Sequence, residues 1–231
     1  MTTMTKSDII AELTLDEKNN NGEILDKTND YIEYIDYESD ITMQYRYQES
    51  CTDEYMKSRI FISENIAKKG FTADYIIQIL KAAFKDDYFD AICTMSGIII
   101  PSNESEWLDM LQKTIRTSDI ISEWYDYTED CEYLGKMYTT HQIVFINEPK
   151  HIEIAKELGD EQYPASNEYE IGMITSLIHE MRHLYLDTNL FVSEDHIPLS
   201  ENKEENVEEF ARTAYENLPY NLKHFLTTKT I

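Results

Sequence analysis

One short motif constrains this chain more than any other feature. Residues 179–183 read H-E-x-x-H inside an apolar, helix-like run. Two histidines four residues apart lie about 40° apart around a helix axis, on one face, so both imidazoles can reach one Zn²⁺ at roughly 2 Å. Glu180 points to the side where a metal-bound water would lie, and a carboxylate there can take a proton from that water. The alternative is a solvated helix face that carries two histidines by chance.

The residues before the motif predict a helix. Asn167 with Glu170 three residues later has the pattern of a capping box. Both histidines lie beside an apolar stripe rather than on it, and Gly172 lies on the histidine side of the helix. Because glycine costs about 1 kcal/mol in a helix interior, we expect another group to approach closely at Gly172. The stripe has helical spacing and consists of Ile171, Ile174, Ile178, Met181 and Tyr185.

A catalytic zinc site usually has three protein ligands and an open position for water. The metzincin pattern would place glycine at position 186 and histidine at position 189, where this chain has Leu186 and Asn189. That class is therefore disfavoured. A third ligand is better sought in a second helix, which follows Pro198 and which Ser200 can cap.

The angular positions of the glutamates in this second helix single out one of them. At 100° per residue, Glu204 lies about 60° from the centre of the apolar face and Glu208 about 100°, whereas Glu205 and Glu209 point to solvent. We therefore predict Glu204 as the third ligand. Glu208, one turn later, is expected to accept a hydrogen bond from a ligand histidine. The apolar face consists of Val207, Phe210, Ala211, Ala214 and Leu218.

This combination resembles the gluzincin metallopeptidases. The shared features are H-E-x-x-H, a gap of 20 residues, and then E-x-x-V-E-x-F-A. Within that group the chain is most similar to ImmA/IrrE-type peptidases, whose pattern is E-x-x-A-N-x-F-A, and it departs from them at Val207 and Glu208. The resemblance covers residues 167–211. It implies an α+β, mostly helical fold with a zincin-like core and a small sheet, one Zn²⁺ per chain, and hydrolysis of a peptide bond in a protein substrate.

Several further residues are candidates for supporting roles. In the implied reaction Glu180 acts first as general base and then as acid, and the oxyanion needs a hydrogen-bond donor. Tyr215, His196 and Tyr185 are candidates for that donor. Asp187 lies one turn after the second histidine. It either accepts a hydrogen bond from a ligand histidine, is an alternative metal ligand, or is a plain surface carboxylate.

The charge of the chain limits its partners. The sequence has 45 Asp and Glu against 20 Lys and Arg, which gives a net charge of −25. Such a chain is not expected to bind nucleic acid or an anionic membrane directly, whereas a basic protein or peptide substrate fits it. Two other functions remain open: a non-catalytic acidic inhibitor that acts as a decoy for a nucleic-acid-binding protein, and a pseudo-peptidase that keeps zinc for stability.

The cysteines and the N-terminus indicate a compartment. Cys51, Cys93 and Cys131 are odd in number and widely spaced, which is typical of free thiols in a reducing environment. The N-terminal residues lack the apolar run of a secretory signal, and no segment reaches 18 consecutive apolar residues. We therefore expect a cytoplasmic protein.

Composition and pattern divide the chain into three expected parts. Residues 1–30 are expected to be a flexible segment, residues 31–130 a mainly helical region of unknown role, and residues 131–231 the zincin-like catalytic region. Two interpretations remain open near the start of the second part. Tyrosines at 31, 34 and 37 have the spacing of a helical turn, whereas residues 41–47 alternate as in a strand.

Four further segments have clear expectations. We predict helices over 52–69, 73–85 and 103–125. Residues 142–146 are β-branched and apolar and predict a strand, paired with an earlier strand near residues 131–134. Such a sheet would precede the metal-binding helix.

Overall fold

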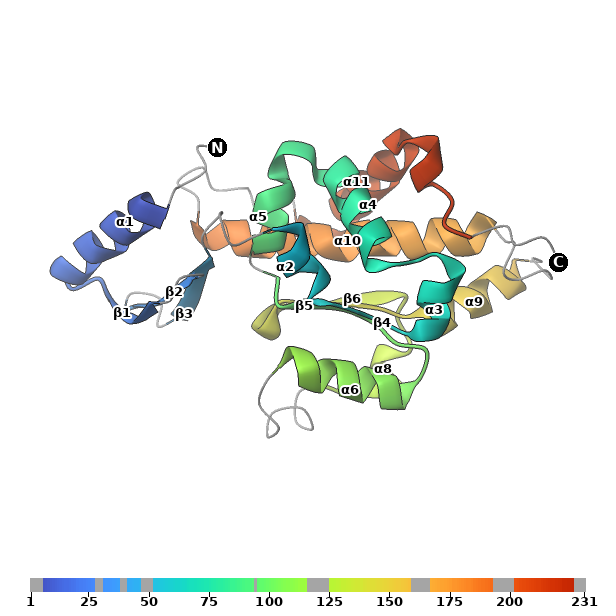
Figure 1. The fold of residues 1–231 in the computed structure, drawn as a ribbon, viewed down its shortest axis with the longest axis horizontal. Helices are drawn as coiled ribbons and strands as arrows, with labels where there is room; N and C mark the ends of the chain where they lie inside the picture. Colours follow the sequence, from blue (N-terminus) through green and yellow to red (C-terminus); the bar gives the residue numbers. More distant parts are fainter. Residues whose placement is uncertain are drawn as a thin grey trace.

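The chain is mostly helical and belongs to the α+β class (Figure 1). The structure is a computed structural model, and it describes residues 6–27, 31–37, 41–46, 52–93, 95–115, 125–158, 167–192 and 202–226. Within this part of the chain there are two sheets, one of three strands and one of four.

The three-stranded sheet belongs to a small N-terminal unit. Helix α1 (Lys6–Lys18) is followed by the antiparallel strands β1 (Gly22–Lys27), β2 (Tyr31–Asp36) and β3 (Ile41–Arg46). The unit has its own apolar cluster, formed by Leu13, Ile32 and Tyr34.

One expectation for this unit is wrong, and one open interpretation is decided. Residues 22–27 form a strand where we expected flexibility, because they gain hydrogen bonds from β2 that no local pattern reveals. The tyrosine spacing at 31, 34 and 37 does not form a helical turn. Both β2 and β3 are strands, so the strand interpretation of residues 41–47 is confirmed for 41–46.

The four-stranded sheet forms the centre of the rest of the chain. Its order is β4-β5-β7-β6, with β4, β5 and β7 parallel and β6 antiparallel to β7 at one edge. The two inner strands read G-I-I-I and I-V-F-I and are completely buried, as is typical of parallel strands covered on both faces. The strands are β4 (Ile60–Ile62), β5 (Gly97–Ile100), β6 (Gly135–Tyr138) and β7 (Ile143–Ile146).

Alternate residues of the inner strands enter two different cores. Ile98 and Val144 point into the larger core, whereas Ile99 and Phe145 point into the smaller one, which follows from the two-residue period of a strand. The larger core lies under α10 (Asn167–Val192), and the smaller one under α6 (Glu104–Thr114), on the other face of the sheet (Figure 1).

Helix α10 is the longest element and connects the sheet to the remaining helices. It packs against β6 and β7 on one side and against α4, α5 and α11 on the other (Figure 1). The apolar stripe expected for this helix is buried or half-buried, with Ile174, Ile178 and Met181 fully covered. These helices are α4 (Ala73–Phe84), α5 (Tyr88–Cys93) and α11 (Glu204–Asn217), and the shorter ones are α2 (Asp53–Lys57), α3 (Glu64–Lys69), α8 (Tyr127–Asp130) and α9 (Glu148–Glu157).

The last described segment is anchored on α10. The buried Glu170 carboxylate accepts backbone hydrogen bonds from Phe225 at 2.6 Å and from Leu226 at 2.8 Å. Gly70 has a φ of 114°, and a Cβ there would lie 1.9 Å from the Phe225 carbonyl oxygen. This close approach explains why the end of α3 needs glycine.

The expected boundary between residues 130 and 131 does not match the structure. Strands β4 and β5 come from the first side of that boundary, β6 and β7 from the second, and the larger core runs from Met56 to Phe225. The expected helix over 52–69 is interrupted by β4, and the strand that pairs with β7 follows residues 131–134 instead of coinciding with them. The helix expected over 103–125 begins as expected, because Asn103 caps α6, but it ends at Thr114, and Ile115 already has a non-helical backbone. Residues 116–124 lie outside the described part.

Two sequence expectations concern the environment of the protein. Among the described residues no helix has the length and apolarity needed to cross a membrane. Cys131 is a free thiol, as expected, whereas Cys51 and the side chain of Cys93 lie outside the described residues.

Candidate metal centre

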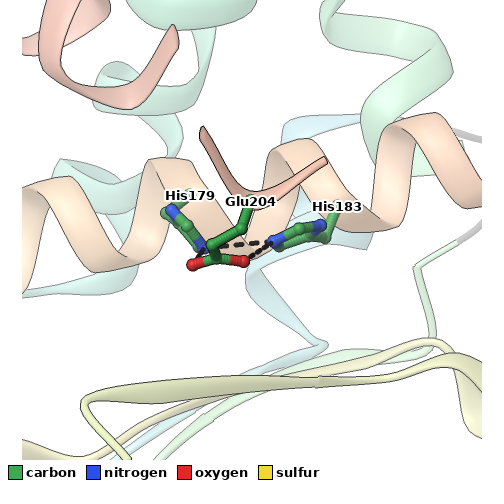
Figure 2. A group of neighbouring side chains, drawn as sticks. All are labelled: His179, His183 and Glu204. Carbon is green, nitrogen blue, oxygen red and sulfur yellow. Dashed lines mark hydrogen bonds and ion pairs between the residues drawn. The ribbon is translucent and has the colours of Figure 1, made fainter. Parts of the chain in front are cut away.

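Helix α10 presents the two histidines of the H-E-x-x-H motif on one face (Figure 2). The side chains of His179 and His183 are 17% and 18% exposed, so both are held by packing yet reach the surface. Their Nε2 atoms lie 3.1 Å apart. Residues four apart lie about one turn apart on the same face of a helix, so the two rings are neighbours, as the spacing predicts.

Glu204 meets both histidines from the neighbouring helix (Figure 2). Its Oε1 lies 3.1 Å from Nε2 of His179, and its Oε2 lies 3.2 Å from Nε2 of His183. The three side chains therefore bring their ligand atoms to within 4.8 Å of one another. Glu204 is the first residue of α11, so this helix begins later than expected, and the predicted cap Ser200 lies outside the described residues.

Asn202 completes the surroundings of His183, and the sequence analysis missed it. Its Oδ1 lies 2.8 Å from Nδ1 of His183, and its Nδ2 donates to Oδ1 of Asp187 at 3.1 Å. An amide oxygen only accepts, so Nδ1 of His183 donates to it, and in the neutral ring this leaves the lone pair at Nε2. Asp187 thus acts on His183 through Asn202 and is not one of the converging ligand atoms.

Glu180 lies between α10 and the edge strand β6. It is 8% exposed, and a Cβ on Gly135 would lie 2.8 Å from its Cγ and 3.0 Å from its Oε1. Burial, and to a smaller extent the negative charge of Glu204, raise the pKa of Glu180 to about 8, although a hydrogen bond from the Met137 backbone lowers it. A carboxyl group with such a pKa can exchange a proton near neutral pH.

Glu208 does not form the hydrogen bond that we expected from it. Its side chain is exposed, and among the described residues it bonds to neither histidine, whereas Asn202 fills that role at His183. The charge of Glu208 nevertheless affects the pKa of His179. Burial lowers the pKa of His179, aided by His183, while Glu204 and more weakly Glu208 oppose that shift.

The structure separates the proposed oxyanion donors from the histidines. Burial, and to a smaller extent the charges of Glu170 and Glu168, raise the pKa of the Tyr215 hydroxyl, so Tyr215 lies toward the start of α10. Glu170 is nine residues before His179, about 13 Å along the helix. Tyr185 packs in the larger core against Phe84. His196 lies outside the described residues.

Gly172 has the close neighbour that its position in a helix predicted. A Cβ there would lie 2.7 Å from Nδ1 of His151, a buried side chain from α9. Burial lowers the pKa of His151 to about 4, against a smaller opposite effect from a hydrogen bond to the Leu134 backbone. His151 was not singled out from the sequence as a functional residue, and here it joins α9 to α10.

Comparisons with known proteins do not assign this chain to a group. No protein-family model, no curated protein and no solved structure matches it.

Proposed function

We propose that this chain is a zinc-dependent metallopeptidase with a zincin-like core, in which His179, His183 and Glu204 hold one Zn²⁺. The observation that carries the proposal is the convergence of three side chains from two helices, each of which can offer one ligand atom to a metal ion. In the tautomer fixed by Asn202, Nε2 of His183 has no proton to donate to Glu204 or to His179. A divalent cation shared by the three groups would balance the charge of Glu204 and hold the Nε2 atoms of both histidines.

The donor set and its spacing fit zinc. Two imidazoles and one carboxylate are a common set of protein ligands in catalytic zinc sites, and they leave a fourth position for water. Ligands about 2.1 Å from a tetrahedral ion lie roughly 3.4 Å apart. The observed separations of 3.1 and 3.2 Å are close to this value.

The remaining residues supply proton transfer and substrate binding. Bound zinc would polarise the scissile carbonyl and acidify a water molecule. Glu180 would take a proton on its carboxylate and deliver it to the leaving amine, from a position fixed by Gly135 and by the backbone of Met137. Among the described strands β6 pairs only with β7, at the edge of its sheet beside Glu180, and an extended peptide would bind along this edge.

The test combines metal content with turnover. Purified protein should contain one zinc per chain and cleave members of a library of internally quenched peptides that includes Lys- and Arg-rich sequences. His179→Ala should lose the zinc, whereas Glu180→Gln should retain zinc and fold while its turnover falls by about 10²–10⁴-fold. Glu205→Gln, an exposed carboxylate one residue from Glu204, is the matched control and should retain both zinc and turnover.

The outcomes separate the alternatives. Activity that survives in Glu180→Gln would contradict the role given to that residue. Wild-type protein that binds zinc but cleaves no peptide would indicate a pseudo-peptidase. Wild-type protein that contains no zinc would contradict the proposal.

A further inference from the structure

Strand β6 is held by a buried carboxylate that the candidate metal centre does not use. Asp130 is the last residue of α8, and a short turn leads from it into β6. Its Oδ1 accepts from Nζ of Lys136 at 2.7 Å, and its Oδ2 accepts from the hydroxyl group of Tyr138. One carboxylate thus binds two residues of the same strand.

The two faces of β6 have different partners. Gly135 and Met137 face α10, since a Cβ on Gly135 would lie 2.8 Å from Cγ of Glu180 and the Met137 side chain packs against the larger core. The alternate residues, among them Tyr138 of the smaller core, face the opposite way. A shift of β6 that begins at the buried carboxylate therefore reaches Glu180 through the backbone of the strand.

The carboxylate adds a constraint that an edge strand otherwise lacks. Strand β6 has four residues and, among the described strands, pairs only with β7. Alternate residues of a strand lie on one face about 7 Å apart, so a carboxylate that bonds to both fixes how the strand tilts on its sheet. The turn before β6 is itself held, because the side chain of Asn147 donates to the carbonyl groups of Cys131 and Tyr133 at 3.1 and 2.9 Å.

The surroundings of Asp130 strengthen both of its bonds. Burial, and then the hydrogen bond to Asp130, raise the pKa of the Tyr138 hydroxyl, so this group keeps its proton and donates. A hydrogen bond is stronger where water is excluded, and a buried charge that loses its partner is strongly destabilising. The ammonium group of Lys136 balances the charge of Asp130 in this place.

We propose that Asp130 is a positioning residue: through Lys136 and Tyr138 it fixes the place of β6, and thereby the place of the Glu180 side chain beside the candidate metal ligands. The effect on turnover rests on the proposed peptidase function. The coupling between Asp130 and β6 does not, and it can be measured without metal or substrate.

The chain contains a matched control network. Glu148 is also a buried carboxylate that accepts from a lysine and from a tyrosine hydroxyl group, those of Lys69 and Tyr169. Tyr169 is ten residues before His179, about 15 Å along α10. Glu148→Gln and Tyr169→Phe should therefore cost stability in a similar way and leave turnover unchanged.

The first experiment measures turnover in zinc-loaded, full-length protein. Asp130→Asn should keep one zinc per chain and lower kcat by about tenfold or more, because a displaced general base works poorly. KM should change by less than about threefold, since the metal ligands remain. Tyr138→Phe removes one hydroxyl group, keeps the ring, and should lower kcat by about threefold or more. This variant tests the proposal even where Asp130→Asn does not fold.

A double variant separates positioning from a general loss of stability. Because Asp130 acts through Glu180, Asp130→Asn should lower the residual kcat of Glu180→Gln by less than about twofold. A carboxylate that only stabilises the fold would lower kcat by the same factor in both backgrounds.

The second experiment uses metal-free protein. The amide of Met137 donates to Glu180, and its hydrogen exchange, followed by NMR, should be at least about tenfold faster in Asp130→Asn than in the wild type. Glu148→Gln should leave this exchange rate unchanged.

The outcomes distinguish this inference from the proposed function. Wild-type protein without zinc or turnover would contradict the proposed function, and exchange of the Met137 amide would still decide whether Asp130 holds β6. Active wild-type protein with unchanged kcat in folded Asp130→Asn and Tyr138→Phe would overturn the inference alone. Equal losses of kcat in the control variants, or equal Met137 exchange in Asp130→Asn and wild type, would also overturn it.

Discussion

At the scale of single residues, two small contacts decide how the acidic residue of the motif is held. Gly135 leaves the space that the Glu180 side chain fills, and the Met137 backbone donates to its carboxylate. Neither residue is distinctive in the sequence, because the contact joins an edge strand to a helix more than 40 residues later.

Gly135→Ala should therefore displace Glu180 while leaving the metal ligands in place. The added Cβ would lie 2.8 Å from Cγ of Glu180, closer than real contacts allow. We expect zinc content to be retained and turnover to fall by about tenfold or more, because a general base that moves by about 1 Å works poorly. Metal analysis and peptide cleavage, measured on the same preparation, check this.

A double variant provides the control for this prediction. Aspartate is one methylene shorter, so Gly135→Ala combined with Glu180→Asp should cost less activity than the sum of the two single changes. Strictly additive losses would show that Gly135 and Glu180 act independently.

His151 makes the stability of the fold depend on pH. Burial lowers its pKa to about 4 in the folded protein, against about 6.5 in an unfolded chain. Below pH 6.5 the unfolded state therefore binds more protons than the folded state, and stability is lost as pH falls toward 4. This one group should lower the free energy of unfolding by about 2 kcal/mol between pH 7 and pH 5.

Urea unfolding of the wild type and of His151→Leu at both pH values measures this effect. The variant should lose about 2 kcal/mol less than the wild type over the same interval. NMR titration of the ring gives an independent result, and a His151 ring that titrates near its ordinary pKa in the folded protein would contradict the prediction.

At the scale of elements, the short segment before α11 is as important for the site as the helix itself. Asn202 connects His183 to Asp187 before the helix begins, and Glu204 opens the helix. The order of these residues places an orienting amide and a ligand carboxylate against the same histidine.

Asn202→Ala should weaken zinc binding without removing a ligand. Loss of the hydrogen bond to Nδ1 frees the His183 ring to rotate and to change tautomer, and such outer contacts typically contribute 10- to 100-fold in metal affinity. Competition with a fluorescent zinc chelator measures the change, with Glu205→Gln as a control of unchanged affinity. An affinity equal to that of the wild type would mean that packing alone orients His183.

Elements with strong local periodicity could be predicted from the sequence, and those made by distant pairing could not. An apolar stripe with helical spacing predicts helix α10, and a run of β-branched residues predicts strand β7. Strand β4 has three residues within a helix-like stretch, and its identity comes from parallel pairing with β5, which begins 37 residues later.

The same distinction applies to the candidate site. The histidine pair follows from spacing within one helix, and Glu204 from its angle on a second helix. Asn202 lies outside both helices and has no periodic pattern, so only the folded arrangement reveals it. Tyr215 shares a helix with Glu204 but lies about 16 Å further along it, which an argument based on residue type alone ignores.

At the scale of the whole molecule, the apolar clusters of the described residues separate the N-terminal unit from the rest of the chain. The cluster of Leu13, Ile32 and Tyr34 serves the N-terminal unit, whereas the two larger cores are built from residues 56–225. The three converging metal-ligand candidates and the four strands of the central sheet also lie between residues 56 and 225.

Removal of residues 1–51 should therefore leave a folded, zinc-binding protein. The truncated chain keeps Thr52, which caps α2, and both faces of the central sheet. We expect one zinc per chain and a melting temperature within a few degrees of the full-length value, because no residue of the two larger cores is lost. Calorimetry with and without EDTA measures both, since a ligand present at 100 times its dissociation constant stabilises the folded state by about 2.7 kcal/mol. A truncated protein that is unfolded, or that no longer responds to EDTA while the full chain does, would show that the N-terminal unit is needed to hold α10 and α11 in register.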